Sequence, residues 1–257
     1  MSIMEISQPN PEEVTMEGTY TVPVPLMKSI ISYAESTVCI LQTAPRGDIC
    51  GIQGSAGLYE HESMLWAFIT NHHIVQFTDI EFITNIHITF ELRGGFSLKI
   101  RAEYIEFVST SPNLDATIIG ITKEFMLKLR HLGVNFLKAK PAVAKERIAL
   151  ISYPKGEFSI DKGEIESVEG FTLSYDVAGD KGSSGAPILA WDFCAVGIHK
   201  SRSNNPRQGT LRYGTALQNI IEFHISKILP FLKYLSLFYI KNLYSSCTHT
   251  ILYKYSV

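Results

Sequence analysis

The sequence predicts an all-β protein, a barrel or a sandwich of short strands. Apolar runs of strand length recur along the chain and are bounded by Gly, Pro, Asn or Asp, as in IHITFEL, RIALISY and FCAVGIH. In SLKIRAEY, apolar and charged residues alternate from Leu98 to Tyr104, which is the period of a half-buried strand. Many short strands separated by turns favour a barrel or a sandwich over a sheet of βαβ units.

A few segments interrupt the β pattern. Residues 1–18 are polar and acidic, which predicts a disordered lead-in. From Val24, VPLMKSIISYAESTVCILQT is typical of a short helix that runs into a strand. Residues 122–141 are charged, contain helix-forming residues and end at a proline, which indicates a connector between two β halves. A last helix is expected to begin near Leu217.

Composition narrows the class of protein. The 257 residues are 46% hydrophobic and 19% charged, with a net charge of −2, so the chain can bury a core as one two-part domain or as two small domains. The balanced charge gives no reason to expect a nucleic-acid or membrane partner. The cysteines at 39, 50, 194 and 247 lack CxxC or zinc-type spacing and do not form a dense disulfide pattern, so we expect no metal.

The ends of the chain bear on its location. The segment MSIMEISQPNPEEVTMEG lacks the positive start and apolar centre of a secretory signal, which predicts an intracellular protein of the cytoplasm or nucleus with reduced thiols. The apolar stretch from Ile228 to Ile240 contains Pro230 and Lys233 and is short for a membrane span. We interpret it as a C-terminal packing helix.

The segment KGSSGAPIL places two adjacent serines between Gly182 and Gly185. Gly, Ser and Pro are turn residues, so the segment could be only a turn before a buried strand. A nucleophilic serine would need a histidine base, an acid that orients the imidazole, and backbone N–H donors for the oxyanion. Gly182 could turn its N–H inward and Gly185 could leave room around the serine, because neither has a Cβ.

Several segments together resemble one family. GSSGAP resembles the Gly-x-Ser-Gly-Gly-Pro signature of chymotrypsin-fold (trypsin-like) serine peptidases. FITNHHIV resembles the Thr-Asn-x-His-Val-Val segment of the high-temperature-requirement peptidases, and NLDATIIGI resembles the Asp-x-Ala-Leu-Leu segment. ISYPKG and the stretch from KGEIESVEG to the serines also resemble glutamyl endopeptidases. His73, Asp115 and Ser184 follow in the family's order, separated by 42 and 69 positions, and the resemblance extends over residues 50–217.

The resemblance implies a fold and an activity. The expected fold is two six-stranded antiparallel β-barrels with a C-terminal helix. The expected activity is that of a serine endopeptidase, which acts on protein or peptide substrates and needs no cofactor. Ser184 would be the nucleophile, His73 the general base and Asp115 the orienting acid, with the N–H groups of Gly182 and Ser184 as the oxyanion hole. The divisions are residues 1–18 (lead-in), 19–121 (barrel with His and Asp), 122–141 (connector), 142–217 (barrel with the nucleophile) and 218–257 (helix and tail).

Each residue has a plainer alternative. Asp115 could simply end a turn after SPN. Ser183 lacks a following glycine, and it cannot form the ion pair that activates trypsin-type zymogens. His72 would face away from His73 on an extended strand. His87 lies in FITNIHI, a near repeat of FITNHHI, and the chain continues from it into an alternating strand. We therefore interpret His72 and His87 as surface or packing histidines.

His199, in CAVGIHKS, is the candidate for substrate selection. Glutamyl endopeptidases and picornaviral main proteases carry a histidine in a similar Gly-(Ile/Met)-His, where it contacts Glu or Gln before the scissile bond. Alternatively, His199 is a strand residue with a backbone partner. Ala178 and Gly179 stand near the position of a hydroxyl residue in glutamyl endopeptidases, and the lack of an acid at Ala178 argues against a preference for Arg or Lys. If Lys200 and Arg202 point inward, their positive charges would favour an acidic side chain before the scissile bond.

A different class of function remains open on sequence grounds. The chain could be a protease-like barrel that binds proteins without cleaving them, because Ala186 replaces the family's second glycine. It could also be a fragment of a larger protein. The residues beyond Leu217 have no counterpart in the resemblance, and the oligomeric state is not predicted.

Overall fold

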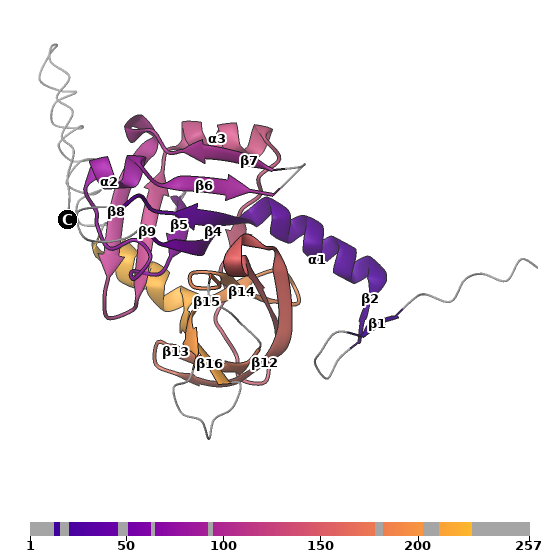
Figure 1. Cartoon of the computed structure of the whole chain (residues 1–257). Coiled ribbons are helices and arrows are strands. Elements are labelled where there is room, and N and C mark those ends of the chain that lie inside the picture. The colour runs from indigo at the N-terminus through magenta and orange to yellow at the C-terminus, as the bar shows by residue number, and fades with distance from the viewer. Residues whose placement is uncertain are drawn as a thin grey trace, which may run out of the picture.

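The computed structural model of the chain describes residues 13–15, 21–45, 51–62, 65–91, 95–177, 182–202 and 211–227. Two β units follow one another along the chain and lie against each other, the first above the second in Figure 1. The sequence-based prediction of an all-β, chymotrypsin-like architecture is confirmed, and it includes the helix at the C-terminal end of the described residues.

The first unit is an eight-stranded sheet. Its hydrogen-bonded path runs β7-β6-β3-β4-β5-β9-β8, and β10 pairs with β4 in parallel while the other pairs are antiparallel. The strands are β3 (Val38–Gln42), β4 (Gln53–His61), β5 (Leu65–Thr70), β6 (His87–Phe90), β7 (Phe96–Lys99), β8 (Ile105–Ser111), β9 (Ala116–Ile121) and β10 (Leu137–Lys138).

The second unit is a closed barrel of six antiparallel strands in the order β11-β12-β13-β16-β15-β14. The strands are β11 (Arg147–Ser152), β12 (Ser159–Glu169), β13 (Thr172–Asp176), β14 (Pro187–Ala190), β15 (Ala195–Arg202) and β16 (Leu211–Ala216). Every residue of β14 is buried, because this strand packs on both the barrel interior and the other unit.

Helices lie at the ends and at the junction of the units. Helix α1 (Val24–Thr37) leads into β3, as the sequence predicts, and it extends away from the body toward the hairpin of β1 (Glu13–Thr15) and β2 (Thr21–Pro23) (Figure 1). Helix α2 (Ile80–Thr84) follows the turn after β5, and α3 (Lys123–His131) lies in the predicted connector. Short 3-10 turns occur at Ala102–Tyr104 and Pro154–Gly156, and residues 217–227 form the C-terminal helix.

Three apolar cores stabilise the fold, one inside each unit and one between the two. One fills the first unit, around Phe68 and Ile88, and one fills the barrel, around Ile148 and Tyr175. The third lies between the units and joins β5 and β9 to β11, β14 and the C-terminal helix. This third core fixes the position of one unit against the other, so loops that lie at the seam are held at a constant separation.

Some expectations differ from the structure in detail. The first unit has more strands than the six expected, because the connector adds β10 to the edge of β4 and the segment from Phe96 forms a separate strand. The alternating pattern predicted through Tyr104 ends as a strand at Lys99, where a 3-10 turn follows. Part of the predicted lead-in, Glu13–Thr15, is a strand, and the apolar segment 228–240 lies outside the described residues.

Candidate active site

His73 and Asp115 meet because two neighbouring strands end together. Strand β5 ends at Thr70 and β9 begins at Ala116, and these strands pair with Thr70 opposite Thr117. The turn after β5 carries His73, and the turn before β9 carries Asp115. The ring Nδ1 of His73 lies 2.8 Å from Asp115 Oδ2, and the backbone N–H of His73 donates to Asp115 Oδ1 at 3.0 Å. The carboxylate therefore holds both the ring and the backbone of the histidine.

Asp115 has an unusual backbone that its neighbours stabilise. Its φ of 49° lies in the left-handed region, which aspartate tolerates better than most residues. Its N–H donates to the Pro112 carbonyl at 3.1 Å, and its own carbonyl accepts from the Asn71 side-chain amide at 2.9 Å. The Asp115 side chain is 11% exposed, whereas the His73 side chain is 43% exposed. The acid is thus enclosed and the imidazole is open on one side.

Ser184 lies in the turn that joins β13 to β14. Two glycines shape this turn, Gly182 with a φ of 101° and Gly185 with a φ of 81°. A Cβ at Gly185 would lie 2.2 Å from both the Ser55 carbonyl oxygen and the Thr70 hydroxyl, so only glycine fits there. Ser183 points the other way, since it is fully buried and its hydroxyl donates to Ser152 Oγ at 3.1 Å. The Ser183 hydroxyl is therefore engaged in a buried hydrogen bond and does not face the site.

Contacts across the seam bring the Ser184 turn to His73. The Ser184 carbonyl accepts from the Ser55 N–H at 2.8 Å. A Cβ at Gly54 would lie 2.9 Å from the Ile74 side chain and 3.1 Å from the Ser184 carbonyl oxygen. Ile74, the residue after His73, and the backbone of Ser184 therefore both pack against Gly54. Within the described part of the chain, no hydrogen bond joins the Ser184 hydroxyl to His73.

The turn also presents backbone donors. The structure records no acceptor among the described residues for the N–H groups of Gly182 and Ser184. Ala186, which replaces the second glycine of the resembled signature, is fully buried and donates its N–H to the Ser183 carbonyl at 3.0 Å. Ala186 is not among the residues with positive φ. The alanine methyl therefore fits this turn without backbone strain.

His199 is buried beside the Ser184 turn. Its carbonyl accepts from the Gly185 N–H at 2.9 Å, and its ring Nδ1 lies 2.5 Å from the Tyr175 hydroxyl. Burial, with smaller electrostatic effects from Arg212 and His73, lowers the pKa of His199 to about 4. Burial also raises the pKa of the Tyr175 hydroxyl well above its usual value. Both groups are therefore neutral at physiological pH.

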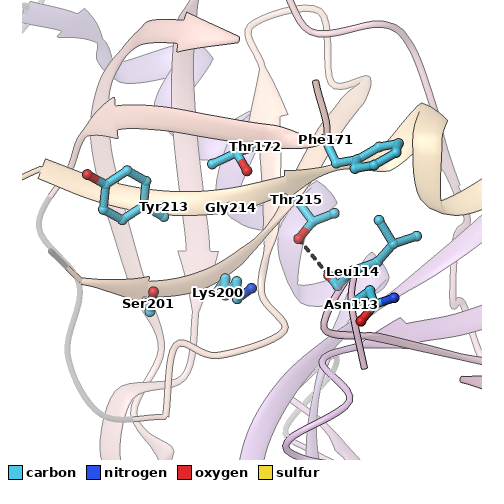
Figure 2. Close-up of a pocket in the computed structure, with 9 residues that line it drawn as sticks. All are labelled: Asn113, Leu114, Phe171, Thr172, Lys200, Ser201, Tyr213, Gly214 and Thr215. Carbon is cyan, nitrogen blue, oxygen red and sulfur yellow. Dashed lines mark hydrogen bonds between the residues drawn. The ribbon is translucent and has the colours of Figure 1, made fainter. Parts of the chain in front are cut away.

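A cavity of about 280 Å³ lies at the seam next to these residues. Figure 2 shows the side chains around it, with the Thr215 hydroxyl donating to the Leu114 carbonyl at 2.8 Å across the two units. Its lining adjoins Asp115 on one side and His199 on the other. The lining residues are Asn113, Leu114, Phe171, Thr172, Lys200, Ser201, Tyr213, Gly214 and Thr215.

The remaining candidates from the sequence fall into three groups. His72 is half-buried and its Nδ1 lies 2.7 Å from the Thr110 hydroxyl, away from Asp115, and His87 is exposed on β6. Lys200 is among the residues that line the cavity at the seam. Ala178 and Gly179 lie outside the described residues, and so does the side chain of Arg202.

Sequence reasoning missed three residues of this region. Ser55, Asn71 and Tyr175 lie in segments that the motifs include, but their partners are distant in sequence. In the part of the chain that the structure describes, no three His, Cys, Asp or Glu side chains lie close enough to bind a metal ion together. No helix among the described residues has the length and apolarity to span a membrane.

Comparison with known proteins places the fold in a class. No family model matches the sequence. The active form of the Rv3671c protease from M. tuberculosis is similar at a TM-score of 0.58 and 15% identity, over 88% of this chain and 94% of that one. The serine endoprotease from Yersinia pestis is similar at a TM-score of 0.57 and 12% identity, over 81% of this chain and 67% of that one. The HtrA-type protease AlgW with a tripeptide is similar at a TM-score of 0.55 and 14% identity, over 79% of this chain and 63% of that one.

The similarity to these solved structures concerns the fold of the whole chain. Their match extends over most of both units, so this chain has the chymotrypsin-like fold found in HtrA-type serine proteases. At such low identity the likeness concerns the fold, and function has to be argued from the site.

Proposed function

We propose that this chain is a serine endopeptidase in which Ser184, His73 and Asp115 form the catalytic triad. The observation that carries the proposal is the double contact between Asp115 and His73, to the ring and to the backbone, at the seam that also carries the Ser184 turn. A carboxylate bound to Nδ1 leaves Nε2 as the basic nitrogen, and the exposed side of the ring is the side from which it can act.

The reaction follows from these positions. The Ser184 hydroxyl oxygen attacks the scissile carbonyl, and Nε2 of His73 takes its proton. The N–H groups of Gly182 and Ser184 donate to the oxyanion of the tetrahedral intermediate. His73 then gives the proton to the leaving amine, and the acyl group stays on Ser184. Water, activated by the same histidine, hydrolyses this ester and restores the enzyme.

The proposal includes a preference for Glu or Gln before the scissile bond. His199 supports it, because the neutral Tyr175 hydroxyl can donate to Nδ1 and so keep the proton on Nε2. Nε2–H would then donate to the side-chain oxygen of Glu or Gln. Lys200, which lines the adjacent cavity, adds a positive charge that favours an acidic peptide. The assignment of Ala178 and Gly179 to substrate binding, made from the sequence alone, belongs to the same proposal.

Labelling with a fluorophosphonate probe tests the proposed activity. The wild-type protein should form an adduct that maps to Ser184 by mass spectrometry, and Ser184→Ala and His73→Ala should abolish it. Ser97→Ala and His87→Ala are matched controls, because both residues are exposed on β6 and β7 and should leave labelling unchanged. A folded wild-type protein that is not labelled would instead favour the protein-binding module, and an adduct on Ser183 would contradict the assignment of the nucleophile.

A further inference from the structure

Ser55 connects the first unit to the turn of the proposed nucleophile. It lies on β4, is fully buried, and makes two hydrogen bonds to the turn between β13 and β14. Its backbone N–H donates to the Ser184 carbonyl at 2.8 Å, and its hydroxyl donates to the Gly182 carbonyl at 2.9 Å. One residue of the opposite unit thus binds both ends of the segment 182–184.

The remaining polar groups of Ser55 have partners as well. Its hydroxyl oxygen accepts from the Tyr153 N–H at 3.2 Å, and its carbonyl accepts from the Thr70 hydroxyl at 2.8 Å. A hydroxyl has one proton, so the acceptance from Tyr153 leaves that proton for Gly182. Thr70 ends the strand that leads to His73. Ser55 therefore lies between the base-bearing turn and the nucleophile-bearing turn and contacts both.

Gly182 is held from two sides. Its carbonyl is bound by Ser55, and its α-carbon packs so closely against the next segment that a Cβ would lie 2.8 Å from the Tyr153 carbonyl and 3.0 Å from the Lys155 nitrogen. Peptide units are planar, so fixing the carbonyls of Gly182 and Ser184 fixes the planes on either side of the Ser184 N–H. The Ser184 N–H shares its own plane with the Ser183 carbonyl, which accepts from the Ala186 N–H at 3.0 Å, so the Ser55 bonds hold the two flanking planes and limit the rotation of this middle unit. The Gly182 N–H lies in the plane before Gly182 and is linked to the bound carbonyl through the Gly182 α-carbon.

We infer that Ser55 is a positioning residue that sets the direction of the Gly182 and Ser184 N–H groups toward the oxyanion. This role rests on the proposed endopeptidase function. Because Ser55 is fully buried, its hydroxyl acts through the Gly182 carbonyl and not directly on a substrate. Donors to an oxyanion are effective because they are already oriented before the reaction. A small rotation of the Gly182 peptide should therefore reduce the stabilisation of the transition state more than it reduces the affinity for the substrate.

The variant Ser55→Ala removes both side-chain bonds of Ser55, the one to the Gly182 carbonyl and the one from the Tyr153 N–H. It keeps the backbone bond to Ser184 and the buried bond between Ser183 and Ser152, so the turn retains two of its anchors. Ser55→Cys keeps a donor at the same position, but the thiol is a weaker donor and somewhat larger. Ser36→Ala is the matched control, because Ser36 is also buried and its hydroxyl also donates to a backbone carbonyl, that of Tyr33, far from the site in sequence.

Kinetics and amide exchange are measured on the whole chain. In Ser55→Ala we expect kcat on a peptide substrate to fall about 10-fold or more, as expected when an oxyanion donor is weakened but not removed. KM should change less than twofold, and Ser55→Cys should lie between Ser55→Ala and wild type. Amide hydrogen exchange at residues 182–186 should be faster in Ser55→Ala and unchanged in Ser36→Ala.

The outcomes separate this inference from the proposed function. If wild type is active and Ser55→Ala keeps its kcat within twofold, or if exchange at residues 182–186 does not change, the positioning role of Ser55 is wrong and the endopeptidase proposal stands. A loss of kcat of equal size in Ser36→Ala would also overturn it, since the effect would then be one of general stability. If wild type neither cleaves peptides nor reacts with a fluorophosphonate, the proposed function fails first and the inference with it.

Discussion

His73 is bound to Asp115 by two different groups, the ring Nδ1 at 2.8 Å from Oδ2 and the backbone N–H at 3.0 Å from Oδ1. The second bond fixes the turn that carries the histidine, and the first orients the ring within that turn. Because Asp115 holds both, substitutions of this residue separate its effect on the ring from its effect on the turn.

The variant Asp115→Asn tests this division of roles. An asparagine oxygen can still accept from the His73 N–H, so the turn should persist. Its NH₂ would then face Nδ1 and force the proton onto Nε2, which removes the base. We expect kcat to fall by about 10⁴-fold with little change in KM and in melting temperature. Steady-state kinetics and thermal unfolding measure this, and a variant with near-normal kcat would show that Asp115 has only a structural role.

The neighbouring Asn71 provides a comparison. Its side chain donates to the Asp115 carbonyl and not to the carboxylate. Asn71→Ala should therefore lower stability and loosen Asp115 without changing the tautomer of His73, so kcat should fall much less than in Asp115→Asn. If kcat falls equally in Asn71→Ala and Asp115→Asn, the contact between Asp115 and the His73 ring is not what makes Asp115 necessary for activity.

Gly185 tests how closely the two units meet. A Cβ there would lie 2.2 Å from the Ser55 carbonyl oxygen and from the Thr70 hydroxyl, in a residue with a φ of 81°. We expect Gly185→Ala to lower the free energy of unfolding by about 3 kcal/mol or more, because backbone strain and overlap add. Denaturant unfolding provides the measurement.

The control for Gly185 is Gly170→Ala. Gly170 also has a positive φ, 58°, but a Cβ there meets nothing within 4 Å. Only the backbone cost remains, about 1 kcal/mol. If the two variants lose equal stability, the close approach of Gly185 to Ser55 and Thr70 is not what restricts this position to glycine.

Sequence reasoning predicted the residues whose partners are implied by motif order, and it missed those whose partners depend on packing. The resemblance to the family implied that His73 and Asp115 pair, and in the structure they come together because β5 and β9 are hydrogen-bonded neighbours. Ser55 lies in GIQGSAGLY, which indicates only a strand of small residues. Its contact with Gly182, 127 positions away, exists only once both units are packed.

The same limit applies to the architecture of the first unit. Local alternation predicted strands, but it does not determine which edges pair. Strand β10 joins β4 in parallel because the connector returns along that edge after α3, and nothing in residues 137–138 marks them as a strand. The pair of Tyr175 and His199 is similar, since these residues lie on β13 and β15, with β16 between them in the barrel.

Tyr175→Phe tests the proposed preference for Glu or Gln. The change removes the hydroxyl that lies 2.5 Å from His199 Nδ1 and keeps the ring that fills the barrel. Without it, the proton is no longer directed to Nε2. We expect kcat/KM for peptides with Glu or Gln before the scissile bond to fall about tenfold, with no change for a peptide that has Leu there. A wild-type cleavage profile dominated by Phe, Leu or Tyr at that position would contradict the preference itself.

Two buried histidines predict how stability depends on pH. Burial, with a smaller effect from Lys227, lowers the pKa of His224 to about 4, as burial does first for His199. In the unfolded chain a histidine titrates near 6.5. Between pH 6.5 and 4 the unfolded state therefore binds more protons than the folded state, so stability falls as the pH falls through this window. Each histidine contributes up to about 3 kcal/mol to the loss, and below pH 4 neither adds to it.

Denaturant unfolding at several pH values measures the effect, and His224→Gln isolates one of the two contributions. His224 is fully buried on the C-terminal helix, with its Nδ1 2.6 Å from the Ser109 hydroxyl. Glutamine can keep a hydrogen bond to Ser109 but does not titrate, so the variant should lose less stability than wild type between pH 6.5 and 4, whatever its stability at neutral pH. The control is His87→Gln, which should keep the wild-type slope, because His87 is exposed on β6 and not buried. Parallel curves for wild type and His224→Gln would mean that His224 is protonated equally in both states, and the helix would then have to open to water well above pH 4.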